Sequence, residues 1–441
     1  MDFDAWLPRA AALRPDRPAL VAGDGAVTTY AELHAAARRT AAALAAAGVG
    51  EGDRVAVSLP AGRAHVATLH AVLGLGATLV PVDPRLAAQE RAQRAAGARL
   101  VVAEPLDPGP GAAERPLRAR LDPGAVATVM HTSGTTAAPK PVALTVANWQ
   151  WNALGSALAL GLDADERWLC TLPLSHVGGL SILIRSAIYG TTVVLHERFD
   201  AAAVAGALAE QGVTLVSLVA TTLRRTLDAG LDRPPRLRCA LIGGGPLAPA
   251  LAARAAAAGV PAAQTYGMTE SCSQATTSLP GEPETAGRAL VGQRVAVADD
   301  GEILLRGETV ARGALAPDGW LHTGDLGALD ERGRLLVTGR KADTIVSGGE
   351  NVAPQEVEAA LLAHPAVADA GVHGRPDPEW GEAVVATVVA RDGHLPGDAL
   401  AAELRAHVAA RLARFKVPKQ VAFAAELPRT ASGKLLRRQL R

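Results

Sequence analysis

The sequence has few cysteines, few aromatic residues and no excess of charge of either sign. Its 441 residues include only three cysteines, Cys170, Cys239 and Cys272, and no two of them form a Cys-x-x-Cys pair. This excludes the spacing of a disulfide framework or a zinc site and fits a reducing cytoplasm. The 44 basic and 44 acidic side chains balance to zero, whereas nucleic-acid binders usually carry a basic excess.

Long hydrophobic runs are also missing. No apolar stretch is long enough to cross a membrane, and the acidic start Met1–Trp6 lacks the layout of a signal peptide. We therefore expect a cytoplasmic protein that binds neither nucleic acid nor membrane, and a homodimer is compatible with this composition. Because hydrophobic residues make up 49% of the chain, its length predicts more than one domain with ample cores.

Helical and extended patterns alternate along most of the chain. Residues 29–48 predict a helix that ends at Gly48, and residues 53–60 predict a buried strand. Further strands are expected at residues 77–82, 125–130, 191–195, 215–219 and 240–246, and further helices at residues 65–73 and 201–211. This alternation predicts an α/β fold with a mostly parallel sheet.

The pattern changes between residues 294 and 337, where turns such as Asp299–Gly301 and Asp330–Gly333 separate short strands. This spacing predicts antiparallel hairpins in a small, barrel-like part. After residue 343, a compact α+β unit is expected from helices at 354–364 and 396–413 and strands at 367–373 and 383–389. The predicted fold is α/β, with a large N-terminal domain of parallel-rich sheets and a small C-terminal α+β domain.

The stretch His131–Lys140 combines hydroxyl residues, a glycine and a lysine directly after a predicted buried strand. Hydroxyl groups, backbone N–H groups and lysine are the donors that bind phosphate oxygens. A serine- and threonine-rich turn without a ligand is the alternative interpretation. The stretch is not a Walker A loop, because no Gly-Lys-Ser/Thr follows a glycine at the required spacing.

Five further motifs follow in order, and they are Gln264–Glu270, Gly319–Asp325, Gly339–Asp343, Ser347–Val352 and Pro428–Lys434. Together with residues 131–140 they resemble the adenylate-forming superfamily of acyl-CoA synthetases, adenylation domains and luciferases. The resemblance implies ATP, Mg²⁺ and coenzyme A. A carboxylate attacks the α-phosphate of ATP, and a thiol then attacks the acyl-adenylate. Such a site needs cations and N–H donors around a crowded phosphate.

The resemblance assigns phosphate binding to a loop and to an acidic turn. The loop residues for the β- and γ-phosphates are Thr132, Ser133, Gly134, Thr135, Thr136 and Lys140. Ala137 and Pro141 stand where the family usually has glycine, and we interpret both as stiffening this loop. Thr269 and Glu270 match the catalytic pair for the α-phosphate and Mg²⁺. A helix-capping acid is the alternative for Glu270.

Other matching positions would surround the nucleotide. Tyr266, followed by Gly267 and Met268, matches the ring that stacks on adenine. The glycines of one turn, which would let the backbone approach adenine and the acyl group, are Gly243, Gly244 and Gly245. Asp325 matches the acid that accepts both ribose hydroxyls, and Arg340 matches an arginine that reaches the nucleotide. Without the resemblance, Asp325 would be interpreted as a turn residue and Arg340 as a surface charge.

The end of the chain resembles a mobile lid. Lys434 matches the catalytic lysine that swings in to stabilise the α-phosphate and the carboxylate, although a solvated basic tail is the alternative. Arg340–Asp343 resembles the hinge, but the family often has an acid or a lysine where this chain has Ala342. The expected organisation is an N-terminal adenylate-forming domain at 1–339, a hinge at 340–343 and a mobile C-terminal lid domain at 344–441.

Residues 172–190, 237–247 and 266–274 resemble the o-succinylbenzoate–CoA ligases of menaquinone biosynthesis. That acid has a succinyl carboxylate, which is activated, and a ring carboxylate, which needs a cation or several donors once desolvated. Arg185, a charge inside an apolar helical run, is a candidate partner, and a guanidinium that reaches solvent is the alternative. The expected acyl-site residues are His176 at the gating position, Arg185, Gly244, Ser271 and Ser273, with Gln274 as a further donor. Coenzyme A is assigned to Gly348 and Gly349.

Three alternatives stay open on the sequence alone. The first is a CoA ligase for another aryl or medium-chain acid. The second is a stand-alone adenylation domain that loads a carrier protein, although no aspartate for a substrate amine is apparent. The third is a non-catalytic nucleotide-binding or scaffold protein, against which the intact set of Glu270, Asp325, Arg340 and Lys434 speaks. A hydrolase is excluded, because the chain has neither Gly-x-Ser-x-Gly nor His-Glu-x-x-His.

Overall fold

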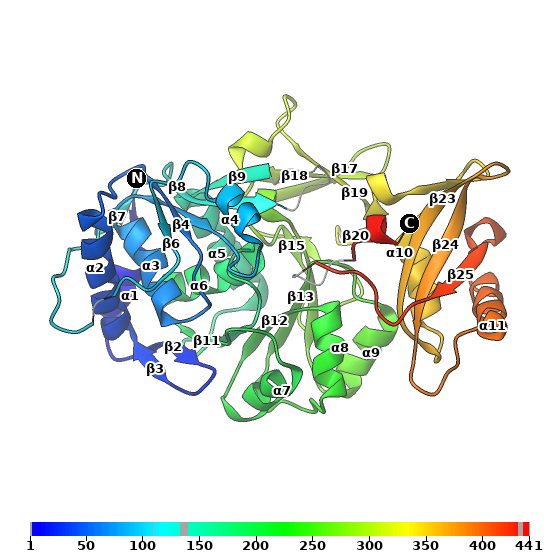
Figure 1. Cartoon of the computed structure of the whole chain (residues 1–441), viewed down its shortest axis with the longest axis horizontal. Helices are drawn as coiled ribbons and strands as arrows, with labels where there is room; N and C mark the ends of the chain where they lie inside the picture. The colour runs from blue at the N-terminus through cyan, green and yellow to red at the C-terminus, as the bar shows by residue number, and fades with distance from the viewer. Residues whose placement is uncertain (1, 108, 133–139, 431–434, 441) are drawn as a thin grey trace.

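The computed structural model describes residues 2–107, 109–132, 140–430 and 435–440. Figure 1 shows an elongated molecule with the N-terminal elements at one end and the C-terminal unit at the other. Within the described ranges, no helix is both long and apolar enough to cross a membrane. The predicted α/β class, with a large sheet-rich part and a small C-terminal unit, is confirmed.

A parallel sheet near the N-terminus ends in one antiparallel strand. Its order is β6 (Leu100–Val102), β4 (Arg54–Val57), β5 (Thr78–Pro81), β8 (Val126–Thr132) and β9 (Lys140–Thr145). The helices of this region are α1 (Trp6–Leu13), α2 (Tyr30–Ala46), α3 (Arg63–Gly74) and α4 (Ala88–Arg94). A capping box starts α2, since Glu32 N–H donates to Thr29 Oγ1 over 3.2 Å and Thr29 N–H donates to the Glu32 carboxylate over 2.8 Å.

The middle of the chain builds a larger and mainly parallel sheet. Its order is β16 (Arg288–Ala289), β15 (Thr276–Thr277), β14 (Ala262–Tyr266), β13 (Cys239–Gly243), β12 (Leu215–Val219), β10 (Arg167–Cys170), β11 (Thr192–Leu195), β2 (Pro18–Ala22) and β3 (Val27–Thr29). Its helices are α5 (Val146–Leu160), α6 (Val177–Tyr189), α7 (Ala201–Glu210), α8 (Ala220–Asp228) and α9 (Pro249–Ala257). Because β10, β12, β13 and β14 run parallel, their carboxyl ends share one edge, where open α/β sheets bind ligands.

The predicted hairpins form a separate antiparallel sheet. Its strands, in both chain and spatial order, are β17 (Gln293–Val297), β18 (Glu302–Gly307), β19 (Leu321–Leu329) and β20 (Leu335–Arg340). Asp325 and Arg340 are direct partners across β19 and β20. This register places Arg340, at the end of the N-terminal region, beside Asp325, the carboxylate predicted to bind the ribose.

The C-terminal unit has its own sheet and core, at the right of Figure 1. Its sheet contains β21 (Ile345–Ser347), β22 (Glu350–Val352), β23 (Val367–Asp377), β24 (Gly381–Ala390) and β25 (Gln420–Phe423), and its helices are α10 (Pro354–Leu362) and α11 (Asp398–Ala409). α10 also packs against β20. The Arg224 guanidinium on α8 donates to the Ala368 carbonyl in β23, so the two parts of the molecule touch at more than the connection.

Candidate active site

The predicted phosphate loop joins two antiparallel strands. β8 ends at Thr132, β9 begins at Lys140, and these two residues are direct partners, with the Thr132 hydroxyl donating to the Lys140 carbonyl over 3.4 Å. The predicted loop residues between them, namely Ser133, Gly134, Thr135, Thr136 and Ala137, lie outside the described residues. The strand β9 was not predicted, and it changes the interpretation of Pro141. This proline lies inside an edge strand, where a missing N–H is tolerated, and not in the loop that it was expected to stiffen.

The acidic turn lies against this hairpin. Thr269–Ser271 forms a single 3-10 turn directly after β14, and β8 and β9 both pack against it. The Ala311 N–H donates to the Glu270 carbonyl over 2.8 Å. Among the described residues, the half-buried Glu270 carboxylate has no hydrogen-bond or ion-pair partner. A carboxylate without such a partner, on a turn that packs against β8 and β9, fits the predicted Mg²⁺ site, since Mg²⁺ typically binds one or two protein carboxylates together with phosphate oxygens.

A close backbone crossing fixes the shape of this turn. A Cβ atom at Gly267 would lie 1.7 Å from the Ser273 carbonyl oxygen, so only glycine fits there without a shift of the backbone. Cys272 and Ser273 both have positive φ angles, 54° and 85°, which is uncommon outside glycine. Ser271 is fully buried, and its hydroxyl accepts from the Met268 N–H over 3.0 Å. The Ser271 hydroxyl therefore stabilises the turn. Its predicted contact with the acyl substrate stays a prediction.

Tyr266, Asp325 and Arg340 form one hydrogen-bonded assembly. The Tyr266 hydroxyl donates to Asp325 Oδ2 over 2.9 Å, and Arg340 Nε lies 2.8 Å from Asp325 Oδ1. Burial, followed by the nearby Asp325 carboxylate, raises the pKa of Tyr266 well above its ordinary value, so the phenol keeps its proton. The Asp325 N–H donates to Thr323 Oγ1 over 3.1 Å. Each carboxylate oxygen of Asp325 thus has one partner and keeps further acceptor capacity for a ribose hydroxyl.

Gly243 ends β13 and Gly244 and Gly245 follow it, and the three glycines differ in their surroundings. Gly244 has a φ angle of +77°, so a side chain there would be strained. A Cβ at Gly243 would lie 3.2 Å from Thr265 Cγ2, whereas a Cβ at Gly245 would meet nothing within 4 Å. The turn follows the carboxyl end of β13, next to β14 and Tyr266. The geometry therefore leaves open space beside Gly245 for a ligand or solvent.

His176 lies at the start of α6, directly before Val177. Burial lowers the pKa of His176, an effect that Asp83 opposes and that Arg94 and Arg85 reinforce. Its imidazole is therefore neutral at neutral pH and can donate from one nitrogen and accept at the other.

Arg185 does not fit the alternative in which its side chain is a solvated helix residue. Its guanidinium does not reach solvent, because the residue is only 1% exposed. Its Nε lies 3.2 Å and its Nη2 2.5 Å from the Asn152 side-chain oxygen, and its guanidinium lies 5.5 Å from the centre of the Trp168 ring. No carboxylate among the described residues forms an ion pair with it. A buried cation without an anion is costly, and burial accordingly lowers the pKa of Arg185.

Asn152 was missed by the sequence analysis and ties Arg185 to the acidic turn. Its amide donates to the Gln274 carbonyl over 3.1 Å while its oxygen accepts from Arg185. Burial raises the pKa of Cys272 well above its ordinary value, an effect that the charge of Arg185 opposes. An asparagine on the buried face of the apolar helix α5 was the signal that could have identified it.

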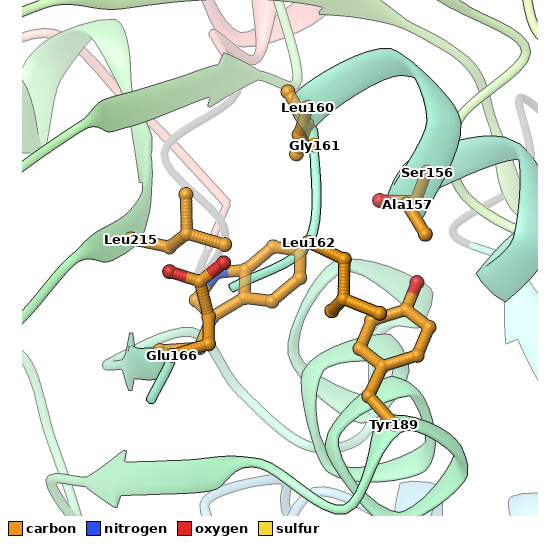
Figure 2. A pocket seen from close by; sticks show the side chains of 9 residues that line it. Ser156, Ala157, Leu160, Gly161, Leu162, Glu166, Tyr189 and Leu215 are labelled. Carbon is orange, nitrogen blue, oxygen red and sulfur yellow. The ribbon is translucent and has the colours of Figure 1, made fainter. Parts of the chain in front are cut away.

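The packing beside Arg185 is tight. Figure 2 shows Tyr189 rising from α6 toward Ser156 and Ala157 on α5, with Glu166 and Leu215 on the opposite side. The Tyr189 hydroxyl donates to the Ala153 carbonyl, and the Glu166 carboxylate pairs with Arg238. The hollow between these side chains is too narrow to hold one water molecule. Trp168, which also lines this hollow, is the ring that contacts the Arg185 guanidinium.

The remaining predicted residues lie in the C-terminal unit. Gly348 and Gly349 have φ angles of +64° and +84° and form the two-residue turn between β21 and β22. Two consecutive positive φ angles are what a type I′ hairpin turn requires. Lys434 lies outside the described residues.

Comparison with known proteins identifies the class that this fold and site define. Residues 7–116 and 93–315 match the AMP-binding enzyme family, and residues 356–434 match the AMP-binding enzyme C-terminal domain family. The protein therefore belongs to the AMP-binding enzyme family, as the sequence motifs predict.

Individual relatives narrow the comparison. A 2-succinylbenzoate–CoA ligase of Bacillus licheniformis is 40% identical over 100% of both chains. The o-succinylbenzoate CoA synthetase of Bacillus subtilis in complex with the acyl-adenylate intermediate matches with a TM-score of 0.92 and 38% identity, over 100% of this chain and 98% of that chain. The same enzyme in complex with ATP and magnesium ion matches with a TM-score of 0.91 and 38% identity, over 100% of both. Since both parts of the molecule are included, their arrangement here is close to that of the acyl-adenylate complex.

Proposed function

We propose that this protein is an ATP-dependent acid–CoA ligase that activates o-succinylbenzoate as an acyl-adenylate and transfers the acyl group to coenzyme A. The observation that carries the proposal is the position of the turn Thr269–Ser271. Tyr266, which precedes the turn, joins the assembly of Asp325 and Arg340. Gln274, which follows it, accepts from the residue that holds the buried Arg185. One turn thus connects the proposed nucleotide site with a cation that forms no ion pair within the described part of the chain.

Each group has a task in the first half-reaction. Thr132 and Lys140 flank the loop that would hold the β- and γ-phosphates, and Asp325 would accept the ribose hydroxyls. When bound at Glu270, Mg²⁺ would neutralise phosphate charge so that a carboxylate can approach the α-phosphate. Arg185 would pair the ring carboxylate, which leaves the succinyl carboxylate at the α-phosphate as the attacking group.

The second half-reaction breaks the acyl–phosphate bond of the adenylate. The coenzyme A sulfur attacks the carbonyl carbon, AMP leaves, and the thioester forms. We propose that the C-terminal unit turns about residues 340–343 between the two steps, and that Gly348 and Gly349 then contact coenzyme A. The neutral His176 would lie at the entrance to the acyl site. A cytoplasmic location is also proposed, and three buried, unpaired cysteines agree with a reducing compartment.

The test is a CoA-ligation assay with o-succinylbenzoate beside benzoate and octanoate, in which AMP and pyrophosphate are measured. We expect turnover with o-succinylbenzoate and a bound acyl-AMP when coenzyme A is left out. Release of ADP and phosphate would contradict the mechanism, and turnover with only another acid would identify a different ligase. Lys434→Ala should slow adenylate formation while sparing thioester formation from preformed acyl-adenylate. Sedimentation at micromolar concentration would test whether the protein forms a homodimer.

A further inference from the structure

Lys341, the first residue after β20, is held by two carboxylates of the hairpin sheet. Its Nζ lies 2.6 Å from Asp300 Oδ2 and 3.3 Å from Glu302 Oε2. Asp300 belongs to the turn before β18, and Glu302 begins β18. The hydrogen bond from Lys341 to Asp300, followed by that to Glu302, raises the pKa of the lysine. The N-terminal side of the connection between the two parts is therefore fastened to the large part.

Glu302 links this lysine to the nucleotide assembly. Its Oε1 accepts from the Gly324 N–H over 2.8 Å, one residue before Asp325, while its Oε2 faces Lys341. His322 Nδ1 lies 3.5 Å from the same oxygen. Burial tends to raise the pKa of Glu302, but the donors from Gly324, Lys341 and His322 outweigh it and lower the pKa. One carboxylate thus holds both the strand that carries Asp325 and the residue after Arg340.

The other side of the connection is fastened to the C-terminal unit. Asp343 Oδ2 accepts from Arg437 Nη1 over 2.9 Å, and Arg437 also pairs with Glu358 on α10 over 2.8 Å. Lys341 and Asp343 are the ends of one 3-10 turn. Ala342 between them carries only a methyl group, so it cannot join either set of ion pairs. Each end of this turn is thus held to its own part of the molecule, and a rotation of the C-terminal unit would take place between Lys341 and Asp343.

We propose that Lys341, held by Asp300 and Glu302, is a positioning residue that fixes the start of the connection, and with it Arg340 and Asp325, in the geometry used to form the acyl-adenylate. The inference rests on the proposed function. The ion pairs exist in an arrangement that matches an acyl-adenylate complex with a TM-score of 0.92. These ion pairs hold Lys341, which directly follows Arg340. Glu302 also accepts from the Gly324 N–H, and Gly324 directly precedes Asp325, the partner of Arg340. Its loss should slow the first half-reaction more than the second.

The experiment compares Lys341→Gln with Lys341→Arg and with Arg334→Gln. Arg334 pairs with Asp330 over 2.7 Å in a hairpin turn of the same sheet, so Arg334→Gln removes an ion pair that does not reach the connection. Adenylate formation is followed by pyrophosphate release in a single turnover without coenzyme A. Thioester formation is followed from purified acyl-adenylate with coenzyme A. Thermal unfolding of each variant is measured in parallel.

For Lys341→Gln we expect adenylate formation to slow by about two- to fivefold, the range for an exposed ion pair, with thioester formation changed less. Lys341→Arg should restore most of the rate, and Arg334→Gln should change neither half-reaction. Equal losses in both half-reactions, or a Lys341→Gln protein that matches the Arg334→Gln control, would overturn the proposal. If the wild-type protein forms no adenylate with any acid tested, it is the proposed function that fails, since the comparison among variants starts from an active parent.

Discussion

Arg185 gives the sharpest test of the substrate, because it is a buried cation without a carboxylate partner among the described residues. In Arg185→Met the replacement is unbranched, shorter and without charge. Loss of the donors to Asn152 leaves a buried oxygen unsatisfied, at a cost of about 1–3 kcal/mol. Loss of the contact with the Trp168 ring adds about 1 kcal/mol. Removing a buried, unpaired charge has the opposite sign and offsets these costs, so the free energy of unfolding should change little.

The effect on catalysis should be larger and selective. If Arg185 pairs the ring carboxylate, its removal leaves that anion desolvated without a partner, at about 3 kcal/mol, or roughly a hundredfold in kcat/KM. The matched substrate is 4-oxo-4-phenylbutanoate, which keeps the succinyl carboxylate and lacks the ring carboxylate. Arg185→Met should hardly change kcat/KM for that acid. Arg185→Lys should recover only part of the loss, because an ammonium cannot make a paired fork contact.

The assay measures kcat/KM for both acids in all three proteins, together with unfolding by denaturant to confirm that each is folded. Equal losses on both acids would mean that Arg185 serves only to hold α6 against Asn152. An unchanged preference would locate the partner of the ring carboxylate elsewhere, with Ser273 and Gln274 as the next residues to replace.

Three further predictions concern the turn, the metal and acid stability. Gly267→Ala should lower the unfolding temperature and the nucleotide affinity, because its Cβ would lie 1.7 Å from the Ser273 oxygen. Gly245→Ala should leave folding unchanged and raise only KM for ATP or acid, because its Cβ would meet nothing within 4 Å. Thermal scans and initial rates distinguish the two variants. Glu270→Gln should raise the Mg²⁺ concentration for half-maximal adenylation by about tenfold or more, since an amide binds Mg²⁺ more weakly than a carboxylate, and a titration after EDTA treatment measures this. Burial lowers the pKa of His70 to about 3, so from about pH 6.5 downward the unfolded chain binds a proton that the folded chain does not, and stability should fall with acid. His70→Met should flatten that dependence in denaturant titrations between pH 7 and 4, and an unchanged slope would assign it to other groups.

The sequence by itself determined the class of fold and most of the residues to examine. Apolar periodicity and turn residues are local properties, so the strand before residue 131, the helix after Thr29 and the hairpins before Arg340 could be read directly. The motifs also identified the family, because phosphate binding requires certain types of donor, and these occur at the spacing typical of that family. What a motif could not give was the surroundings of each side chain. Asp325 was expected at a turn when considered alone, yet it lies in β19, where Arg340 and Tyr266 hold its two oxygens.

Only the tertiary structure decided burial and long-range pairing. Whether Arg185 reached solvent depended on Asn152 and Trp168, which come from other elements and are brought together by the packing of α5, α6 and β10. The strand β9 was not predicted, because its residues show little alternation of apolar and polar side chains. Its pairing with β8, from which a loop separates it along the chain, is what makes it a strand. The grip on Lys341 depended on the register of the hairpin sheet, which places residues 300 and 302 beside residue 341. An ion pair between distant residues needs both partners in one place, and that is set by packing and not by either residue's neighbours along the chain.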